Sequence, residues 1–275
     1  MIICQMTRED LSTALDWAAL EGWNPGLEDA DAFFRADSEG FFAAEIDGAL
    51  AASMSVVNHS DTFSFAGLYI CRPEFRGRGI GLALWTQALD HAGDRTIGLD
   101  GVPAQQDNYR KSGFEWAGET LRFAGDVASA ANPAVRRAEA DDIPALLALD
   151  RRAAGYPREP FLRAWLANTA TRRTLVFEAN GRASGFATHR QCRQGVKIGP
   201  LLAEDIDTAL ALLHAAAEDA GNRPLIIDVP HDQTALSGYC ERIGLTVSFN
   251  TARMYKGAAP TTGGYVQSVA TLELG

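Results

Sequence analysis

The stretch that decides the fold is residues 63–93, which read Phe-Ser-Phe-Ala-Gly-Leu-Tyr-Ile-Cys-Arg-Pro-Glu-Phe-Arg-Gly-Arg-Gly-Ile-Gly-Leu-Ala-Leu-Trp-Thr-Gln-Ala-Leu-Asp-His-Ala-Gly. Residues 63–72 are rich in aromatic and other strand-favouring side chains and predict a buried strand. Leu82, Trp85 and Leu89 recur at helical spacing, which predicts a helix ending at Gly93. The glycine-rich segment 76–81 therefore lies where a strand turns into a helix.

This strand–helix corner has the composition of an anion site. Gly77, Gly79 and Gly81 let the backbone approach a ligand closely, and free N–H groups and the helix dipole point toward it. Arg76 and Arg78 add positive charge in a half of the chain that is otherwise acidic. The spacing excludes the dinucleotide GxGxxG fingerprint, and no Gly-Lys-Ser/Thr follows to make a nucleotide P-loop. The alternative is a glycine-rich corner that binds no ligand and whose arginines are simply solvated.

Outward from the corner, the chain divides into two similar halves. Residues 123–133 have the composition of a connector, so we expect one domain over residues 1–130 and a second over 133–275. Residues 1–132 hold 9 basic and 20 acidic residues, a charge of -11, and residues 133–275 hold 16 and 15, a charge of +1.

The halves also share a layout of short signals. Each has a two-residue hairpin turn, Asp47-Gly48 and Asn180-Gly181, and each ends in Tyr-x-x-x-Gly followed by an apolar residue, from Tyr109 and from Tyr239. The pattern predicts two copies of one α/β unit, each a mixed sheet covered by helices. Chance agreement of short signals is the alternative.

Composition limits the classes of function. The chain has 275 residues, 47% of them hydrophobic, and a formal net charge of -10 that opposes nucleic-acid binding. Four scattered cysteines form no CxxC pair and have no histidines at metal-ligand spacing, so we expect free thiols and no metal. No apolar run reaches about 18 residues. We therefore expect a cytoplasmic protein with no membrane partner, as a monomer or a homodimer.

Two motifs together carry a resemblance to a known family. The run Arg76-Gly77-Arg78-Gly79-Ile80-Gly81 matches the Q/R-x-x-G-x-G/A acyl-CoA loop of the Gcn5-related N-acetyltransferase (GNAT) superfamily, and residues 108–114 resemble its Asn-Tyr-x-x-x-Gly-Phe element. The resemblance implies a sheet whose fourth and fifth strands splay apart to hold acetyl-CoA. The residues that would bind this co-substrate are Tyr69, Ile70, Cys71, Arg76, Gly77, Arg78, Gly79, Ile80, Gly81, Leu82, Asn108 and Tyr109.

The second half departs from the family pattern. Residues 196–205 run from strand to helix without an arginine or a glycine-rich loop. The chain thus resembles tandem GNAT proteins with one working and one degenerate half. We expect the second half to shape the acceptor pocket or the domain interface.

Acyl transfer from a thioester to an amine needs a hydrogen-bond donor for the oxyanion, a general acid that protonates the departing thiolate, and a base that deprotonates the amine. The resemblance implies that a backbone N–H near residues 69–71 binds the oxyanion and that Tyr109 is the general acid; a tyrosine that only packs is the alternative. Asp100 ends the strand beside the acyl site and is our candidate base, acting through water. Anchoring of a cationic substrate and a simple Asp-Gly turn remain open for Asp100.

Four residues of an early loop and helix are candidate acceptor-binding residues, because this loop borders the acceptor site in the superfamily: Trp23, Asn24, Asp29 and Phe33. A solvated acidic helix start is the alternative for the acid. His59, His189 and His231 are weaker candidates near strand ends. We expect an N-acetyltransferase that acts on a small, possibly cationic, amine. The alternatives are a non-catalytic acyl-CoA-binding or regulatory module, and transfer of an aminoacyl or larger acyl group.

Overall fold

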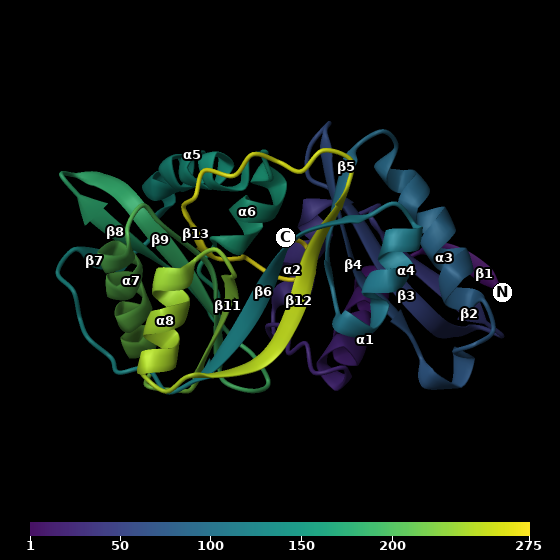
Figure 1. Cartoon of the computed structure of the whole chain (residues 1–275), viewed down its shortest axis with the longest axis horizontal. Helices are drawn as coiled ribbons and strands as arrows, with labels where there is room; N and C mark the ends of the chain where they lie inside the picture. Colours follow the sequence, from purple (N-terminus) through teal and green to yellow (C-terminus); the bar gives the residue numbers. More distant parts are fainter.

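The computed structural model describes residues 1–275 and contains one 13-stranded mixed sheet that runs through both halves of the chain (Figure 1). The strand order is β1-β2-β3-β4-β5-β12-β6-β11-β10-β9-β8-β7, and β13 pairs with β10. The predicted α/β class with a mixed sheet is confirmed. None of the helices is both long and apolar enough to cross a membrane.

The first half contributes six strands and four α-helices: β1 (Ile2–Gln5), α1 (Arg8–Leu20), α2 (Asp29–Ala36), β2 (Phe41–Ile46), β3 (Ala49–Asn58), β4 (Phe63–Cys71), α3 (Ile80–Leu89), β5 (Thr96–Gly101), α4 (Gln106–Lys111) and β6 (Glu115–Gly125). The second half contributes seven strands and four α-helices: β7 (Val135–Arg137), α5 (Ile143–Ala154), α6 (Glu159–Trp165), β8 (Arg172–Ala179), β9 (Arg182–Gln191), β10 (Val196–Ala203), α7 (Ile206–Asp219), β11 (Leu225–Pro230), α8 (Thr234–Arg242), β12 (Thr246–Lys256) and β13 (Val266–Ser268).

The predicted hairpin turns connect β2 to β3 and β8 to β9. Asp47 and Gly48 have φ of 51° and 79°, and Asn180 and Gly181 have φ of 53° and 71°. Both residues of a type I′ turn need positive φ, which Asp, Asn and Gly adopt at low cost. The repeated layout in the sequence therefore reflects a repeated supersecondary structure.

The two halves exchange the long strands β6 and β12 at the centre of the sheet. β12 pairs with β5 of the first half, from Ala252↔Gly101 to Lys256↔Ile97. β6 in turn pairs with β11 of the second half, from Leu225↔Gly125 to Pro230↔Thr120. Figure 1 shows β6 and β12 side by side across the middle of the molecule. Each half of the sheet is therefore completed by the other half of the chain.

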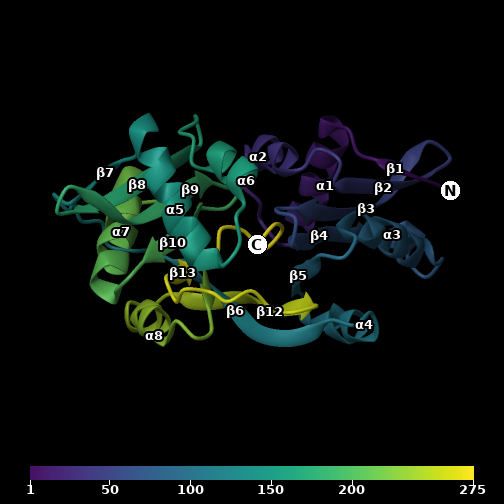
Figure 2. The same ribbon diagram turned by 90° about the horizontal axis from the view of Figure 1, so that it is seen from above.

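The core also joins the halves. Figure 2 shows α1 and α2 on one face of β2, β3 and β4, with α3 on the other face. One hydrophobic cluster includes Leu15 of α1, Phe33 of α2 and Trp165 of α6, and the rings of Phe33 and Trp165 are stacked with centroids 5.9 Å apart. Because this cluster crosses the boundary, the halves are packed as one body.

Each half contains one parallel strand pair that separates along its length. β4 and β5 pair from Phe63↔Thr96 to Ala66↔Leu99 and then diverge. β10 and β11 pair only from Val196↔Leu225 to Ile198↔Ile227. In the second half, β13 then joins β10 and packs against β11, so it occupies the gap. In the first half, no strand fills the gap beyond Ala66.

Candidate active site

The glycine-rich corner connects β4 to α3 at the open gap. Gly77 and Gly79 have φ of 74° and 76°, which favours glycine, and Gly79 is the N-cap of α3. A Cβ at either position would meet no other atom within 4 Å, so the loop presents an open backbone surface. Such a surface at a helix N-terminus, beside two exposed arginines, fits the diphosphate of coenzyme A.

The two arginines of the loop have different surroundings. The Nε of Arg76 donates to the Cys71 carbonyl at 2.8 Å, and its Nη2 donates to Glu21 at 2.7 Å. Arg78 makes no ion pair, and its guanidinium lies over the Phe75 ring, 5.4 Å from the centroid. Arg78 is therefore the guanidinium that can turn to an anion without breaking an ion pair.

The other residues predicted to bind coenzyme A point in several directions. Ile80, the first residue of α3, is buried in the hydrophobic core, whereas the Leu82 side chain is exposed. Ile70 packs in the core on the α1 side of the sheet. Gly81 faces the Tyr69 hydroxyl, and the exposed Asn108 donates to Gln105 at 2.9 Å.

β4 is distorted just after it leaves β5. Leu68 has a φ of 47°, and the register between β3 and β4 shifts at this point. The Ser53 hydroxyl stabilises the distortion by donating to the Leu68 carbonyl at 2.8 Å. A bulge of this kind redirects backbone groups out of the ladder. It lies one residue before the segment 69–71, in which the sequence predicts the oxyanion donor.

Tyr69 and Tyr109 both pack against Trp85 of α3. Their ring centroids are 5.1 Å and 5.2 Å from that of Trp85. Gly101 makes room for Tyr109, because a Cβ on Gly101 would lie 2.9 Å from the Tyr109 ring. Burial, and after it the proximity of Tyr69, raises the pKa of Tyr109 well above its usual range. The phenol therefore stays protonated at neutral pH, as a proton donor must.

A cavity of about 60 Å³ lies between these tyrosines and the second half of the chain. Both halves line it, with Trp23, Ala66, Gly67, Leu68, Tyr69, Trp85, Leu99, Asp100, Val102, Gln105 and Tyr109 from the first and Phe249, Thr251, Leu272 and Glu273 from the second. The structure thus brings together Trp23, Tyr69, Asp100 and Tyr109 of the residues singled out in the sequence. The second-half residues belong to no motif that the sequence reveals. Phe249 and Thr251 reach the cavity because their strand, β12, is exchanged into the centre of the sheet.

Asp100 lines this cavity, but both its oxygens are engaged. Arg253 of β12 donates to them at 2.9 Å and 2.7 Å. Burial raises the pKa of Asp100, and Arg253 opposes that shift. A carboxylate held by a bidentate partner is poorly placed to take a proton from a substrate.

Asp29 and Phe33, two of the predicted acceptor-binding residues, do not line this cavity. Asp29 is fully buried outside the cavity and pairs with Arg172 at 3.2 Å and Arg190 at 3.1 Å. Phe33 is buried against Trp165. Both residues lie at the junction of the halves, so an acidic loop with an aromatic residue here reflects packing.

Asn24 also joins the halves. Its Nδ2 donates to the Gln194 carbonyl at 2.8 Å, and its Oδ1 accepts from the Gln194 N–H at 3.2 Å. It does not line the cavity, so its predicted role in acceptor binding is not supported by its position. Trp23, the adjacent residue, does line the cavity.

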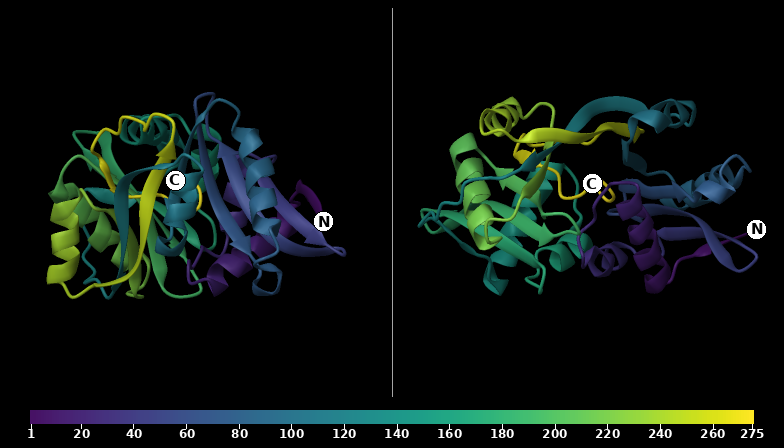
Figure 3. Two further views of the ribbon diagram at one scale, coloured as in Figure 1. Left: turned by 45° about the vertical axis from the view of Figure 1, so that its right-hand side comes forward. Right: turned by 90° about the horizontal axis from the view of Figure 1, so that it is seen from below.

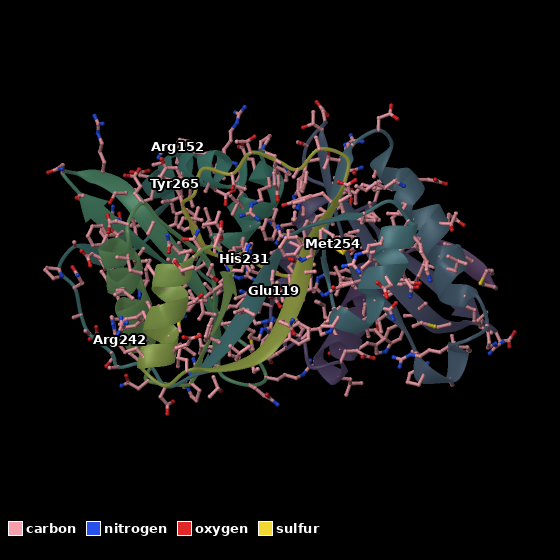
Figure 4. All side chains as sticks on the ribbon, viewed as in Figure 1. Glu119, Arg152, His231, Arg242, Met254 and Tyr265 are labelled. Atoms are coloured by element: carbon pink, nitrogen blue, oxygen red, sulfur yellow. The ribbon has the colours of Figure 1, made fainter.

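The three candidate histidines lie outside the cavity. His59 is buried and its Nε2 bonds to the Leu274 carbonyl at 2.7 Å, and burial lowers its pKa to about 4. His189 pairs with Asp219 at 2.9 Å. His231 accepts the N–H of Glu119 at 3.2 Å, and the two side chains are labelled together near β6 and β12 in Figure 4.

The second half has no equivalent site. Tyr239, at the position corresponding to Tyr109, bonds through its hydroxyl to His214 Nε2 at 2.7 Å. The gap beside β10 contains β13, whose Ser268 hydroxyl donates to the Ile198 carbonyl at 3.2 Å. A Cβ on Gly199 would overlap the backbone of the segment after β13. The open gap of the first half is thus closed in the second.

Comparison with known sequences finds a GNAT match in each half of the chain. Residues 6–114 match the Acetyltransferase (GNAT) family, and residues 146–265 match an Acetyltransferase (GNAT) domain. A protein named holothin acyltransferase, from Pseudoalteromonas sp. (strain SANK 73390), is 33% identical over 273 residues, which cover 97% of this chain and 92% of that protein.

Solved structures show the same fold at low identity. A putative acetyltransferase from Pyrococcus horikoshii covers all of this chain and 95% of its own, with a TM-score of 0.82 and 18% identity. A tandem GNAT protein from the clavulanic acid biosynthesis pathway has a TM-score of 0.65 and 15% identity, over 96% of this chain and 98% of its own. The chain therefore belongs to the GNAT superfamily of acyltransferases, with two copies of the GNAT domain in tandem.

Proposed function

We propose that this chain transfers the acetyl group of acetyl-CoA to the primary amine of a small molecule, at the cavity between its two halves. The observation that carries the proposal is the convergence of three features around β4: the open glycine loop, the bulge at Leu68 and the buried Tyr109. The name of the holothin acyltransferase relative supports transfer of an acyl group to a small acceptor.

We assign the binding of coenzyme A to the first half alone. Residues 76–81 would hold the diphosphate through backbone N–H groups, with Arg78 as the added positive charge. The gap between β4 and β5 beyond Ala66 would hold the pantetheine arm. Bound there, acetyl-CoA supplies an acetyl group activated as a thioester.

The residues around the gap provide two of the needed catalytic groups. A backbone N–H beside the Leu68 bulge would stabilise negative charge that develops on the carbonyl oxygen. The Tyr109 hydroxyl would donate its proton to the departing sulfur. Trp23, Phe249 and Leu272 enclose the cavity with apolar surface, which excludes water and suits the uncharged part of an acceptor.

We extend the proposal to the cellular setting of the protein and the charge of the acceptor. All four cysteines are unpaired, which supports a reducing cytoplasmic setting for the protein.

The cavity's two carboxylate side chains, Asp100 and Glu273, support a cationic acceptor. Because Asp100 is paired with Arg253, Glu273 is the carboxylate of the two that has no ion-pair partner in the chain.

A transfer assay tests the function directly. The purified full chain is incubated with acetyl-CoA and each of a panel of amines: propylamine, benzylamine, tyramine and holothin. We expect at least one amine to release free coenzyme A thiol at a rate that depends on the amine concentration, with the acetylated amine detected by mass spectrometry. Coenzyme A binding without turnover of any amine would instead favour a non-catalytic acyl-CoA-binding module.

A further inference from the structure

Glu273 is the one buried carboxylate of the chain without an ion pair. Asp29 pairs with Arg172 and Arg190, Asp100 with Arg253, Asp150 with Arg158, and Asp228 with Arg122. Glu273 is only 2% exposed, and its Oε1 has no hydrogen-bond partner. It lines the cavity that also contains Tyr69 and Tyr109. A buried, unpartnered carboxylate oxygen is costly and indicates a ligand that it serves.

The segment after β13 holds Glu273 in place. The Thr271 hydroxyl donates to Glu273 Oε2, and the Glu273 N–H donates back to Thr271 Oγ1 at 3.2 Å. The Gly275 N–H donates to the Thr271 carbonyl at 3.1 Å, which closes a turn. Oε2 therefore has a fixed partner, whereas Oε1 has none.

Contacts with the first half fix the position of this turn. His59 bonds to the Leu274 carbonyl at 2.7 Å, and Gly67 of β4 lies directly against the Glu273 backbone, which a Cβ on Gly67 would overlap. The label C in both views of Figure 3 marks this end of the segment between the two halves. Glu273 is thus a second-half residue held against the bulged strand of the first half.

Other charged groups lie near Glu273, and most already have partners. Arg122 of β6 donates to Asp228 of β11 and to the Trp23 carbonyl, and Arg190 of β9 donates to Asp29. The buried Lys197 of β10 donates to the Trp23 carbonyl at 3.0 Å and forms no ion pair. Asp100, with Arg253 behind it, and the phenols of Tyr69 and Tyr109 complete the ionisable groups around the cavity.

We propose that Glu273 is the catalytic base, whose Oε1 binds the ammonium group of the acceptor and takes its proton. This inference rests on the proposed function and adds a residue from the second half to its chemistry. In the transfer step, one N–H proton of the ammonium passes to Glu273, and the amine lone pair forms the new C–N bond to the acyl carbon. The C–S bond breaks, the sulfur takes the Tyr109 proton, and the second N–H proton restores Tyr109. Glu273 then returns its proton to water.

The matched variants are Glu273→Gln, Glu273→Asp and, as the control, Glu218→Gln on the exposed face of α7. The full chain is assayed with the best acceptor of the amine panel, between pH 6 and 9. For Glu273→Gln we expect turnover at pH 7 to fall by roughly 100-fold or more, as when a general base is lost. Its rate should then rise about tenfold per pH unit for an alkyl amine, because only the neutral amine reacts without a base. The rates of wild type and Glu218→Gln should show the same pH dependence, which should be weaker than that of Glu273→Gln.

Thermal unfolding supplies a readout that does not depend on activity. Removing a buried charge with an unpartnered oxygen should leave the melting temperature unchanged or raise it. A clear drop for Glu273→Gln would show a structural role and overturn the proposal, even if no amine of the panel reacts. Glu273→Asp keeps the charge, so it should retain the shape of the wild-type pH profile at a reduced rate.

The outcomes separate this inference from the proposed function. If the wild type acetylates an amine and Glu273→Gln does so within about threefold at every pH, Glu273 is not the base, although the acyltransferase function stands. If the wild type neither binds coenzyme A nor releases its thiol with any amine, the proposed function itself fails.

Discussion

Tyr109→Phe is expected to reduce turnover by about 100-fold to 10,000-fold while leaving the dissociation constant of coenzyme A within about threefold of wild type, as is typical for loss of a general acid. The phenylalanine ring keeps the contact with Trp85 and the space left by Gly101, so only the hydroxyl is lost. Steady-state kinetics with the best acceptor amine and calorimetry with coenzyme A measure the two quantities.

Tyr239→Phe is the matched control for that experiment. Tyr239 is at the corresponding position of the second half, where its hydroxyl bonds to His214 and the residue does not line the cavity. We expect this variant to retain full turnover. Equal losses from Tyr109→Phe and Tyr239→Phe would remove the argument that the first half alone carries the chemistry.

Asp29→Asn should destabilise the fold by about 3–5 kcal/mol, because it leaves the buried guanidinium groups of Arg172 and Arg190 without their counterion. Both guanidinium groups also lie over the Trp165 ring, 4.5 Å and 4.6 Å from its centroid, so they have no alternative route to water. Urea denaturation followed by circular dichroism measures the change in the free energy of unfolding.

Asp31→Asn on the same helix provides the comparison. Asp31 pairs with Arg8 at 2.5 Å, but their side chains are 60% and 56% exposed, so we expect a loss below about 1 kcal/mol. If the two substitutions cost the same, the buried cluster does not hold the halves together.

The same cluster sets a pH dependence of stability. Burial by itself would raise the pKa of Asp29, but Arg190 and Arg172 outweigh it and hold that pKa below its ordinary value of 3.8. A carboxylate whose pKa is lower in the folded state stabilises the fold at pH values above its unfolded pKa. That contribution is lost as the pH falls below about 4. Asp29→Asn should therefore flatten the acid limb of the stability curve.

The first-half cleft could be predicted from sequence because its physical requirements are local. A left-handed backbone conformation at a strand–helix corner favours glycine, and Gly77 and Gly79 adopt that conformation. The type I′ turns at Asp47-Gly48 and Asn180-Gly181 follow from the same rule. Tyr109 was found through a motif that spans only a few residues.

The composite cavity could not be predicted because it depends on contacts between distant segments. β6 and β12 are equivalent strands of two similar units, so local propensity is the same whether each pairs within its own half or with the other. Glu273 lies in an apolar segment with no signature of its own. Asp29 looked like a pocket acid because its two partners, Arg172 and Arg190, lie more than 140 residues further along the chain.

Calorimetric titration of the full chain with acetyl-CoA tests the central claim that the first-half corner is the one binding site for this co-substrate. We predict one equivalent of acetyl-CoA bound per chain, because the corresponding gap of the second half is filled by β13. Arg78→Ala should weaken this binding by roughly 10-fold to 100-fold, as expected when a charge-assisted contact is lost. No detectable heat at millimolar ligand, or two equivalents per chain, would contradict the account.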